Sequence, residues 1–181
     1  GDVDNDGDLD LVTGNFNQAN RLYLNNGTDD PFDGVSGVDI SADAHATRFI
    51  ALRDIDRDGD LDFIAGNMNQ TNRLYLNNGT AAPFDGVTGK DISSDSQATV
   101  ALTVDDVDSD GDLDLIAGNI ARANRLYLNN GTDDPFDGVS GVSITTDIDH
   151  TYAVNLADSD YDGDLDLIVG NANGTNRLYL N

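Results

Sequence analysis

Four acidic segments carry the residues whose types and spacing could do chemistry, and all have the form D-x-D-x-D-G-D-x-D. Each segment places aspartate at relative positions 1, 3, 5, 7 and 9 and glycine at position 6. Segment by segment, these aspartates are Asp2, Asp4, Asp6, Asp8, Asp10; Asp54, Asp56, Asp58, Asp60, Asp62; Asp106, Asp108, Asp110, Asp112, Asp114; and Asp158, Asp160, Asp162, Asp164, Asp166. Alternate carboxylates can converge on one point when a glycine lets the chain turn sharply, and this is what a hard cation requires.

We predict one Ca²⁺ per segment, about four in all. Side chains at positions 1, 3, 5 and 9 and the backbone carbonyl of position 7 would ligate, whereas Mg²⁺ prefers a stricter octahedron and keeps more water. No histidine or cysteine lies in these segments, which argues against zinc. Two carboxylates ~5 Å apart repel by roughly 3 kcal/mol, so folding should depend on the cation. The alternative is a solvated acidic turn, which the fourfold recurrence disfavours.

The acidic segments recur with a period of 52 residues, and other motifs follow the same period. The string N-R-L-Y-L-N begins at Asn20, Asn72, Asn124 and Asn176, and P-F-D-G-V begins at Pro31, Pro83 and Pro135. One period contains four stretches with strand character, 47–55, 61–65, 73–77 and 84–92, with an Asn-Gly turn between the third and fourth. This pattern predicts an all-β fold, a β-propeller-type array of four-stranded antiparallel blades.

The period also predicts how the chain is divided. We expect a partial blade at 1–43 that lacks the first strand, blades at 44–95 and 96–147, and a partial blade at 148–181 that lacks the outer strand. Incomplete blades leave open sheet edges at both ends, and such edges pair readily with further strands. We therefore expect further repeats or other copies of the chain as partners, in a longer array or a fibre.

The acidic loop with its following strand, D-x-D-x-D-G-D-L-D-L-I-x-G-N, precedes N-R-L-Y-L-N-N-G and P-F. This combination resembles the FG-GAP/VCBS repeat family, the blades of integrin-α-type β-propellers, over essentially the whole chain. The resemblance implies a Ca²⁺ loop between the first and second strands of each blade. It also implies a secreted or cell-surface protein that serves adhesion, ligand binding or scaffolding. The close identity among the repeats and the incomplete blade count depart from an ordinary seven-bladed domain.

The composition excludes several classes of function. The 34 acidic and 9 basic residues give a formal net charge of −25, which argues against nucleic-acid binding and against docking to anionic membranes. No apolar run approaches the ~20 residues of a membrane span, so no membrane insertion is expected. The chain has no cysteine, and its two histidines, His45 and His150, occupy different repeat positions. No nucleophile with a neighbouring base is apparent, so we do not expect an enzyme.

These observations predict a calcium-binding extracellular structural or adhesive repeat module, with glycans or surface proteins as further candidate partners. The alternative is a carbohydrate-binding propeller that holds sugar between blades with its variable loops, 16–19, 68–71, 120–123 and 172–175. We expect the repeated arginines, Arg21, Arg73, Arg125 and Arg177, to pair with nearby aspartates. Asn26, Asn78 and Asn130 begin Asn-Gly-Thr sequons, for which a plain turn is favoured over glycosylation.

Overall fold

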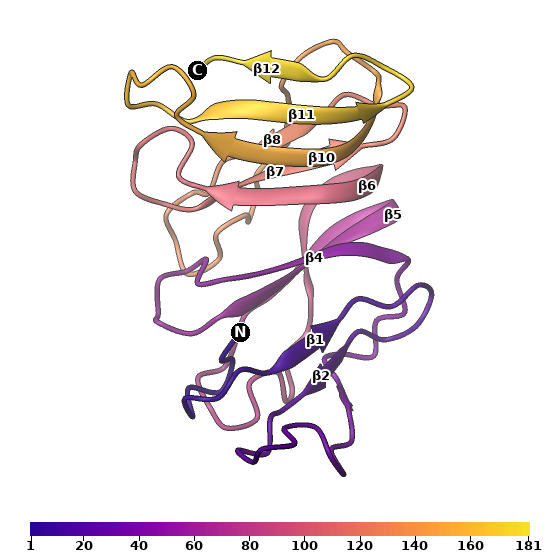
Figure 1. Ribbon diagram of the computed structural model, residues 1–181, viewed down its shortest axis with the longest axis vertical. Coiled ribbons are helices and arrows are strands. Elements are labelled where there is room, and N and C mark those ends of the chain that lie inside the picture. The colour runs from indigo at the N-terminus through magenta and orange to yellow at the C-terminus, as the bar shows by residue number, and fades with distance from the viewer.

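The computed structural model describes residues 1–181 and consists of strands, turns and loops, so the prediction of an all-β fold is confirmed (Figure 1). No helix is present that is long and apolar enough to cross a membrane. The twelve strands are β1 (Leu11–Thr13), β2 (Arg21–Tyr23), β3 (Val38–Asp39), β4 (Thr47–Arg53), β5 (Asp62–Tyr75), β6 (Lys90–Asp105), β7 (Asp114–Asn119), β8 (Arg125–Tyr127), β9 (Val142–Ser143), β10 (His150–Ala157), β11 (Asp166–Ala172) and β12 (Arg177–Tyr179).

All strand pairs are antiparallel and join neighbours in the chain. The strands form three sheets in the orders β1-β2-β3, β4-β5-β6-β7-β8-β9 and β10-β11-β12. We call residues 1–43, 44–95, 96–147 and 148–181 repeats 1 to 4. Equivalent strands keep one register in different repeats: Leu11 pairs with Tyr23, Leu115 with Tyr127 and Leu167 with Tyr179.

The strand boundaries differ from the sequence-based expectation in two ways. In repeat 2 the expected second and third strands are one continuous element, β5, with a left-handed residue, Asn69, at φ 57°. The expected strand over 84–92 begins instead with a turn and a short irregular stretch, and Val87 N donates to Phe84 O in this turn at 3.1 Å. As a result, β6 begins only at Lys90 and then runs on without a break into repeat 3.

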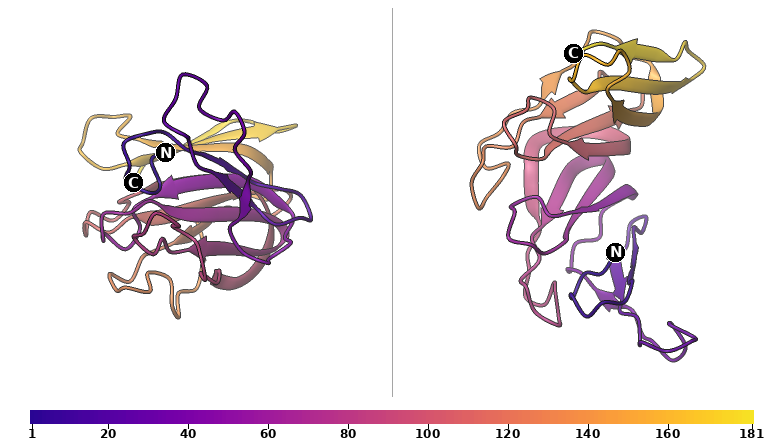
Figure 2. Two further views of the ribbon diagram at one scale, coloured as in Figure 1. Left: turned by 90° about the horizontal axis from the view of Figure 1, so that it is seen from below. Right: turned by 60° about the vertical axis from the view of Figure 1, so that its left-hand side comes forward.

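The sheets stack along the long axis of the molecule, with repeat 1 at one end and repeat 4 at the other (Figure 1). Seen from the side, the stack curves into an open arc (Figure 2). The apolar core lies between successive repeats: one cluster joins repeats 1 and 2, a second joins repeats 2 and 3, and a third joins repeats 3 and 4. A single repeat cannot bury its own apolar face, so each depends on its neighbour for stability.

Candidate metal centre

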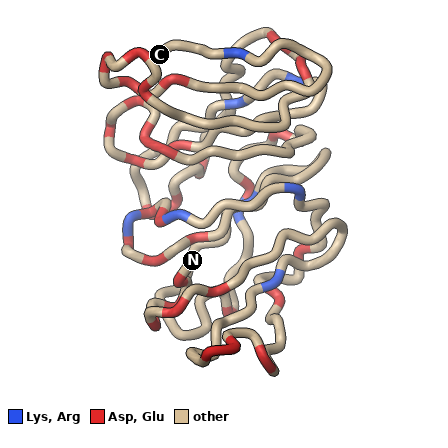
Figure 3. Tube along the Cα trace, in the orientation of Figure 1, with Lys and Arg blue, Asp and Glu red and all other residues tan.

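The four acidic segments form loops, three of which connect the first and second strands of repeats 2, 3 and 4. All four lie along one edge of the stack, at the left of the tube in Figure 3. The chain turns sharply in each loop because two residues adopt left-handed backbone conformations. In the second loop these are Arg57, at φ 63°, and Gly59, at φ 100°. A side chain at φ 100° would be strained, which is the physical reason for glycine at position 6.

Three carboxylates converge in every loop, with one oxygen of each lying within 4.8 Å of the others. The converging aspartates occupy positions 1, 3 and 5 in the first two loops and positions 1, 3 and 9 in the last two. They are Asp2, Asp4, Asp6; Asp54, Asp56, Asp58; Asp106, Asp108, Asp114; and Asp158, Asp160, Asp166. The structure therefore brings together twelve of the twenty aspartates singled out from the sequence, in four groups that could bind a metal ion.

The aspartates at position 7, which were predicted to ligate through the backbone carbonyl, lie outside these groups. Two of their side chains instead contact the preceding acidic loop. Asp60 Oδ1 accepts a hydrogen bond from Asn5 Nδ2 at 2.5 Å, and Asp112 Oδ1 lies 3.0 Å from Arg57 Nη1. Also outside the groups are Asp8 and Asp164 at position 7, Asp10 and Asp62 at position 9, and Asp110 and Asp162 at position 5.

The aspartate at position 1 holds one oxygen in place and leaves the other without a partner. Asp54 Oδ2 accepts a hydrogen bond from Gly59 N at 3.1 Å, whereas Asp54 Oδ1 is shielded from solvent and has no partner. The Oδ1 atoms of Asp2 and Asp106 are in the same situation. A carboxylate oxygen that is shielded and unpaired is costly unless a cation compensates it. The same orphaned oxygen in three loops fits a bound metal.

The aspartate at position 9 closes the loop onto its own repeat. Asp62 is fully buried, and its two oxygens accept hydrogen bonds from Ile55 N and Asn77 N, both at 2.8 Å. Asp114 accepts from the equivalent backbone groups of Val107 and Asn129 at 3.0 and 2.8 Å. Position 9 thus fastens the start of the loop to the end of the third strand, a structural role that sequence reasoning did not assign to it.

Burial affects how the position 9 carboxyls titrate. Burial raises the pKa of Asp62 to about 7, and the nearby carboxylates of Asp56 and Asp58 add to this rise. Burial also raises the pKa of Asp114. In the fourth loop the pKa of Asp166 is lowered instead, because the hydroxyl and backbone N–H of Ser159 donate to this carboxylate.

In excess chelator, we expect the free energy of unfolding to fall as the pH rises from about 4 to about 7. The folded-state pKa of Asp62 lies above the ordinary 3.8, so its contribution is complete below 3.8 and is lost as the pH rises through about 7. Asp43 and Asp91 have lowered pKa values and lose their contributions only below 3.8, outside this range. With excess Ca²⁺ the slope should reverse, because the cation binds deprotonated carboxylates. Urea unfolding at several pH values measures both slopes, and a flat profile in chelator would contradict the expectation.

The last asparagine of N-R-L-Y-L-N is a further site residue, which we did not single out from the sequence. The side chain of Asn77 donates to Val3 O of the first acidic loop at 2.8 Å, a contact between residues 74 positions apart. Asn129 donates to Ile55 O at 3.2 Å, and Asn181 donates to Val107 O at 3.1 Å. Each of these three loops is therefore held by a side chain of the next repeat. The recurrence of this asparagine in all four repeats was the available signal.

The repeated arginines pair with aspartates, as predicted. Arg73 lies 3.0 Å from Asp43 and 2.6 Å from Asp91, and Arg125 lies 2.8 Å from Asp95. The first and last arginines, Arg21 and Arg177, also have aspartate partners: Asp39 at 3.1 Å for Arg21, and Asp147 and Asp149 at 3.7 and 3.6 Å for Arg177. These contacts neutralise part of the acidic charge outside the four loops.

The Asn-Gly-Thr segments are turns whose asparagine amide is occupied. The side chain of Asn26 donates to Asp30 O and Asp33 O at 3.2 and 3.1 Å and accepts from Thr28 N at 3.0 Å. Asn130 makes the same set of bonds with Asp134, Asp137 and Thr132. The structure therefore agrees with the turn interpretation of these sequons.

Fold and loops together define a β-repeat protein with a regular series of candidate cation sites. The sequence profile of the FG-GAP-like repeat matches residues 2–65, 54–117 and 106–169, and the chain belongs to this family.

Cartilage acidic protein 1 of Homo sapiens is 32% identical over 124 residues, which cover 65% of this chain and 19% of that protein. The Mus musculus protein of the same name is 31% identical over 126 residues, covering 65% of this chain and 19% of that protein. The Xenopus tropicalis protein is 29% identical over 133 residues, covering 70% and 20%. The chain thus spans about a fifth of the length of these curated relatives.

Proposed function

We propose that the chain is a calcium-binding extracellular structural or adhesive module, in which each acidic loop holds one Ca²⁺ and the repeats form blades of a β-propeller-type array. The observation that carries this proposal is the shielded, unpaired Oδ1 atom of Asp2, Asp54 and Asp106. The same atom is orphaned at the same position of three successive loops, beside two further carboxylates in each.

The donor set favours Ca²⁺ over other metals. Every side chain that converges in the loops offers carboxylate oxygen, and neither histidine occupies an acidic segment. Side chains at positions 1, 3, 5 and 9 and the carbonyl of position 7 would hold the ion. Flexible loops with several carboxylates and a carbonyl suit the six to eight oxygen ligands of Ca²⁺. The bound ion would neutralise charge and fix the loop; we assign it no catalytic step and propose no enzymatic activity for the chain.

Extracellular conditions fit such sites. Extracellular modules commonly bind Ca²⁺ with dissociation constants of ~10⁻⁴–10⁻³ M. Four ions would add eight positive charges and bring the formal net charge from −25 to −17. The relatives are named after cartilage, which agrees with an extracellular role. We propose further repeats or other copies of the chain as partners, which would pair with strands at the edges of the terminal sheets.

Calorimetric titration with Ca²⁺ and thermal unfolding followed by circular dichroism test the proposal. We expect up to four bound ions and a melting temperature that falls by more than about 15 °C in excess chelator, because each saturated site stabilises the folded state by roughly 2–3 kcal/mol. Asp54→Asn keeps the size of the side chain and should remove one ion from the stoichiometry. Identical melting curves in Ca²⁺ and chelator, with no bound metal, would rule the proposal out.

A further inference from the structure

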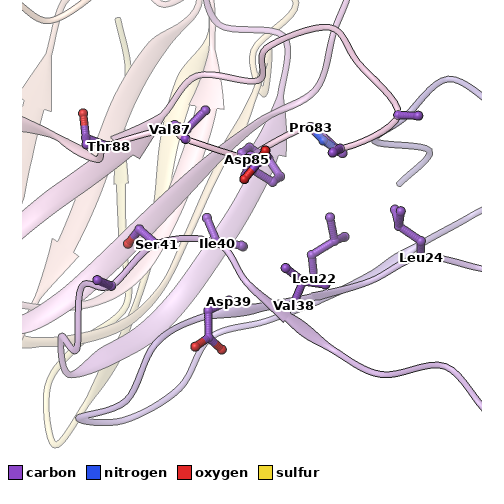
Figure 4. A pocket seen from close by; sticks show the side chains of 15 residues that line it. Leu22, Leu24, Val38, Asp39, Ile40, Ser41, Pro83, Asp85, Val87 and Thr88 are labelled. Carbon is purple, nitrogen blue, oxygen red and sulfur yellow. The ribbon is translucent and has the colours of Figure 1, made fainter.

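A pocket of about 560 Å³ opens between repeats 1 and 2, and none of its lining residues belongs to an acidic loop. We call it the seam pocket. One wall comes from repeat 1 and carries Leu22, Leu24, Val38 and Ile40, as Figure 4 shows. The opposite wall is the turn of repeat 2 that includes residues 81–88. Nine of its fifteen lining residues are hydrophobic, and pockets of ~300–1,000 Å³ with apolar walls are the usual form of a small-molecule site.

The equivalent seam between repeats 2 and 3 is bridged at its surface by an ion pair, whereas the first seam is not. Counting 52 residues on from Val38 and Ala82 leads to Lys90 and Asp134, and Lys90 Nζ lies 3.0 Å from Asp134 Oδ2. This ion pair bridges the second seam at its surface. The short side chains of Val38 and Ala82 cannot make such a bridge. Most of the apolar lining positions are alike in the two seams, but Ala42 and Ala81 are replaced by Ser94 and Asp133.

The charged residues of the pocket determine which sign of charge an apolar ligand can carry. The only charged side chains that line it are two carboxylates, Asp39 and Asp85. Asp39 is paired with Arg21 at 3.1 Å. Asp85 is exposed, and its carboxylate makes no ion pair or hydrogen bond in the structure. With a formal net charge of −25 on the whole chain, an anionic ligand is repelled and a cationic one is attracted.

We propose that the seam pocket binds a small ligand that combines an aromatic or branched apolar group with a positively charged amine. The apolar group would lie between Leu22, Ile40 and Val87, and the amine would pair with Asp85. This inference does not depend on the acidic loops, because the pocket and the loops share no residue.

A series of three indoles tests both the apolar and the charged parts of the proposal. Tryptamine, 3-methylindole and indole-3-propionate carry positive, zero and negative charge on similar frames. They are titrated into the full chain in Ca²⁺ buffer, and binding is followed by methyl NMR at Leu22, Val38 and Val87. We expect tryptamine to bind in about the millimolar range. The neutral compound should bind roughly 2–5-fold more weakly and the anion more weakly still. Asp85→Asn should reduce the preference for the amine over the neutral compound to less than about twofold.

The residues of the seam between repeats 2 and 3 provide matched substitutions for the seam pocket. Val38→Lys combined with Ala82→Asp copies the Lys90–Asp134 pair into the first seam and should weaken tryptamine binding at least tenfold. The reverse change, Lys90→Val with Asp134→Ala, should open the second seam and raise the stoichiometry from one to two, because Asp137 there stands in the place of Asp85. Unchanged binding in the first variant, or indole-3-propionate binding as tightly as tryptamine, would overturn the proposal.

Discussion

Replacing Asp62 with alanine is expected to lower the free energy of unfolding by about 3–5 kcal/mol, both with Ca²⁺ and in excess chelator. The Asp62 carboxylate is fully buried and accepts hydrogen bonds from Ile55 N and Asn77 N. Its removal leaves both donors without a partner, and each buried donor left unpaired costs roughly 1–3 kcal/mol. Urea unfolding of the purified variant measures the difference.

Asp60→Ala is the matched control for this prediction. It removes a carboxylate from the same loop but keeps the backbone carbonyl that we propose as a Ca²⁺ ligand. The Asp60 side chain makes one hydrogen bond in the structure, an exposed one that it accepts from Asn5 Nδ2 of the preceding acidic loop at 2.5 Å. We expect a loss below about 1 kcal/mol. If Asp62→Ala destabilised the protein only in the presence of Ca²⁺, its carboxylate would be a metal ligand without the structural role described above.

Asn129→Ala is expected to lower the free energy of unfolding by about 2–4 kcal/mol and to weaken Ca²⁺ binding at the preceding loop, 54–62. The buried Asn129 amide donates to Ile55 O and to Leu113 O, both at 3.2 Å, and accepts from Gly131 N at 2.9 Å. Alanine leaves the buried Ile55 carbonyl and two partly buried backbone groups without this partner, at roughly 1 kcal/mol or more for each. Calcium titration and urea unfolding of one variant give both quantities.

Asn25→Ala provides the comparison, because Asn25 makes the same bonds within its own repeat and none to another acidic loop. Its side chain donates to Leu9 O at 3.1 Å and accepts from Gly27 N at 3.0 Å. We expect a loss of about 1 kcal/mol. The difference between the two variants reports the bond between repeats together with the greater burial of Asn129, and equal losses would show that this bond contributes nothing to stability.

Much of the candidate site could be predicted from the sequence because it is local. The spacing of Asp54, Asp56 and Asp58 and the glycine after them determine a tight acidic loop within nine residues, and the structure brings these carboxylates together. The position 9 aspartates and the asparagine links involve partners 15 and 74 residues away. Periodicity reveals that such residues recur but does not show what they contact.

The strand boundaries were harder to predict for a related reason. The 84–92 stretch has strand character, but Pro83 and the turn at Phe84 keep it from pairing until Lys90. The continuity of β6 depends on its pairing with β5 on one side and β7 on the other, contacts that a pattern within one period does not contain. A comparison of Val38 with Lys90 and of Ala82 with Asp134 would have shown that the first seam differs from the second. It would not have shown that the first seam contains a pocket.

The asparagine links have a mechanical consequence. They join Asn77 to Val3, Asn129 to Ile55 and Asn181 to Val107, so each of the first three acidic loops is connected to the repeat that follows it. A stretching force along the long axis of the stack would therefore be transmitted through these loops one after another. With Ca²⁺ bound as proposed, the tensile stiffness of the whole array would follow the calcium concentration of its surroundings.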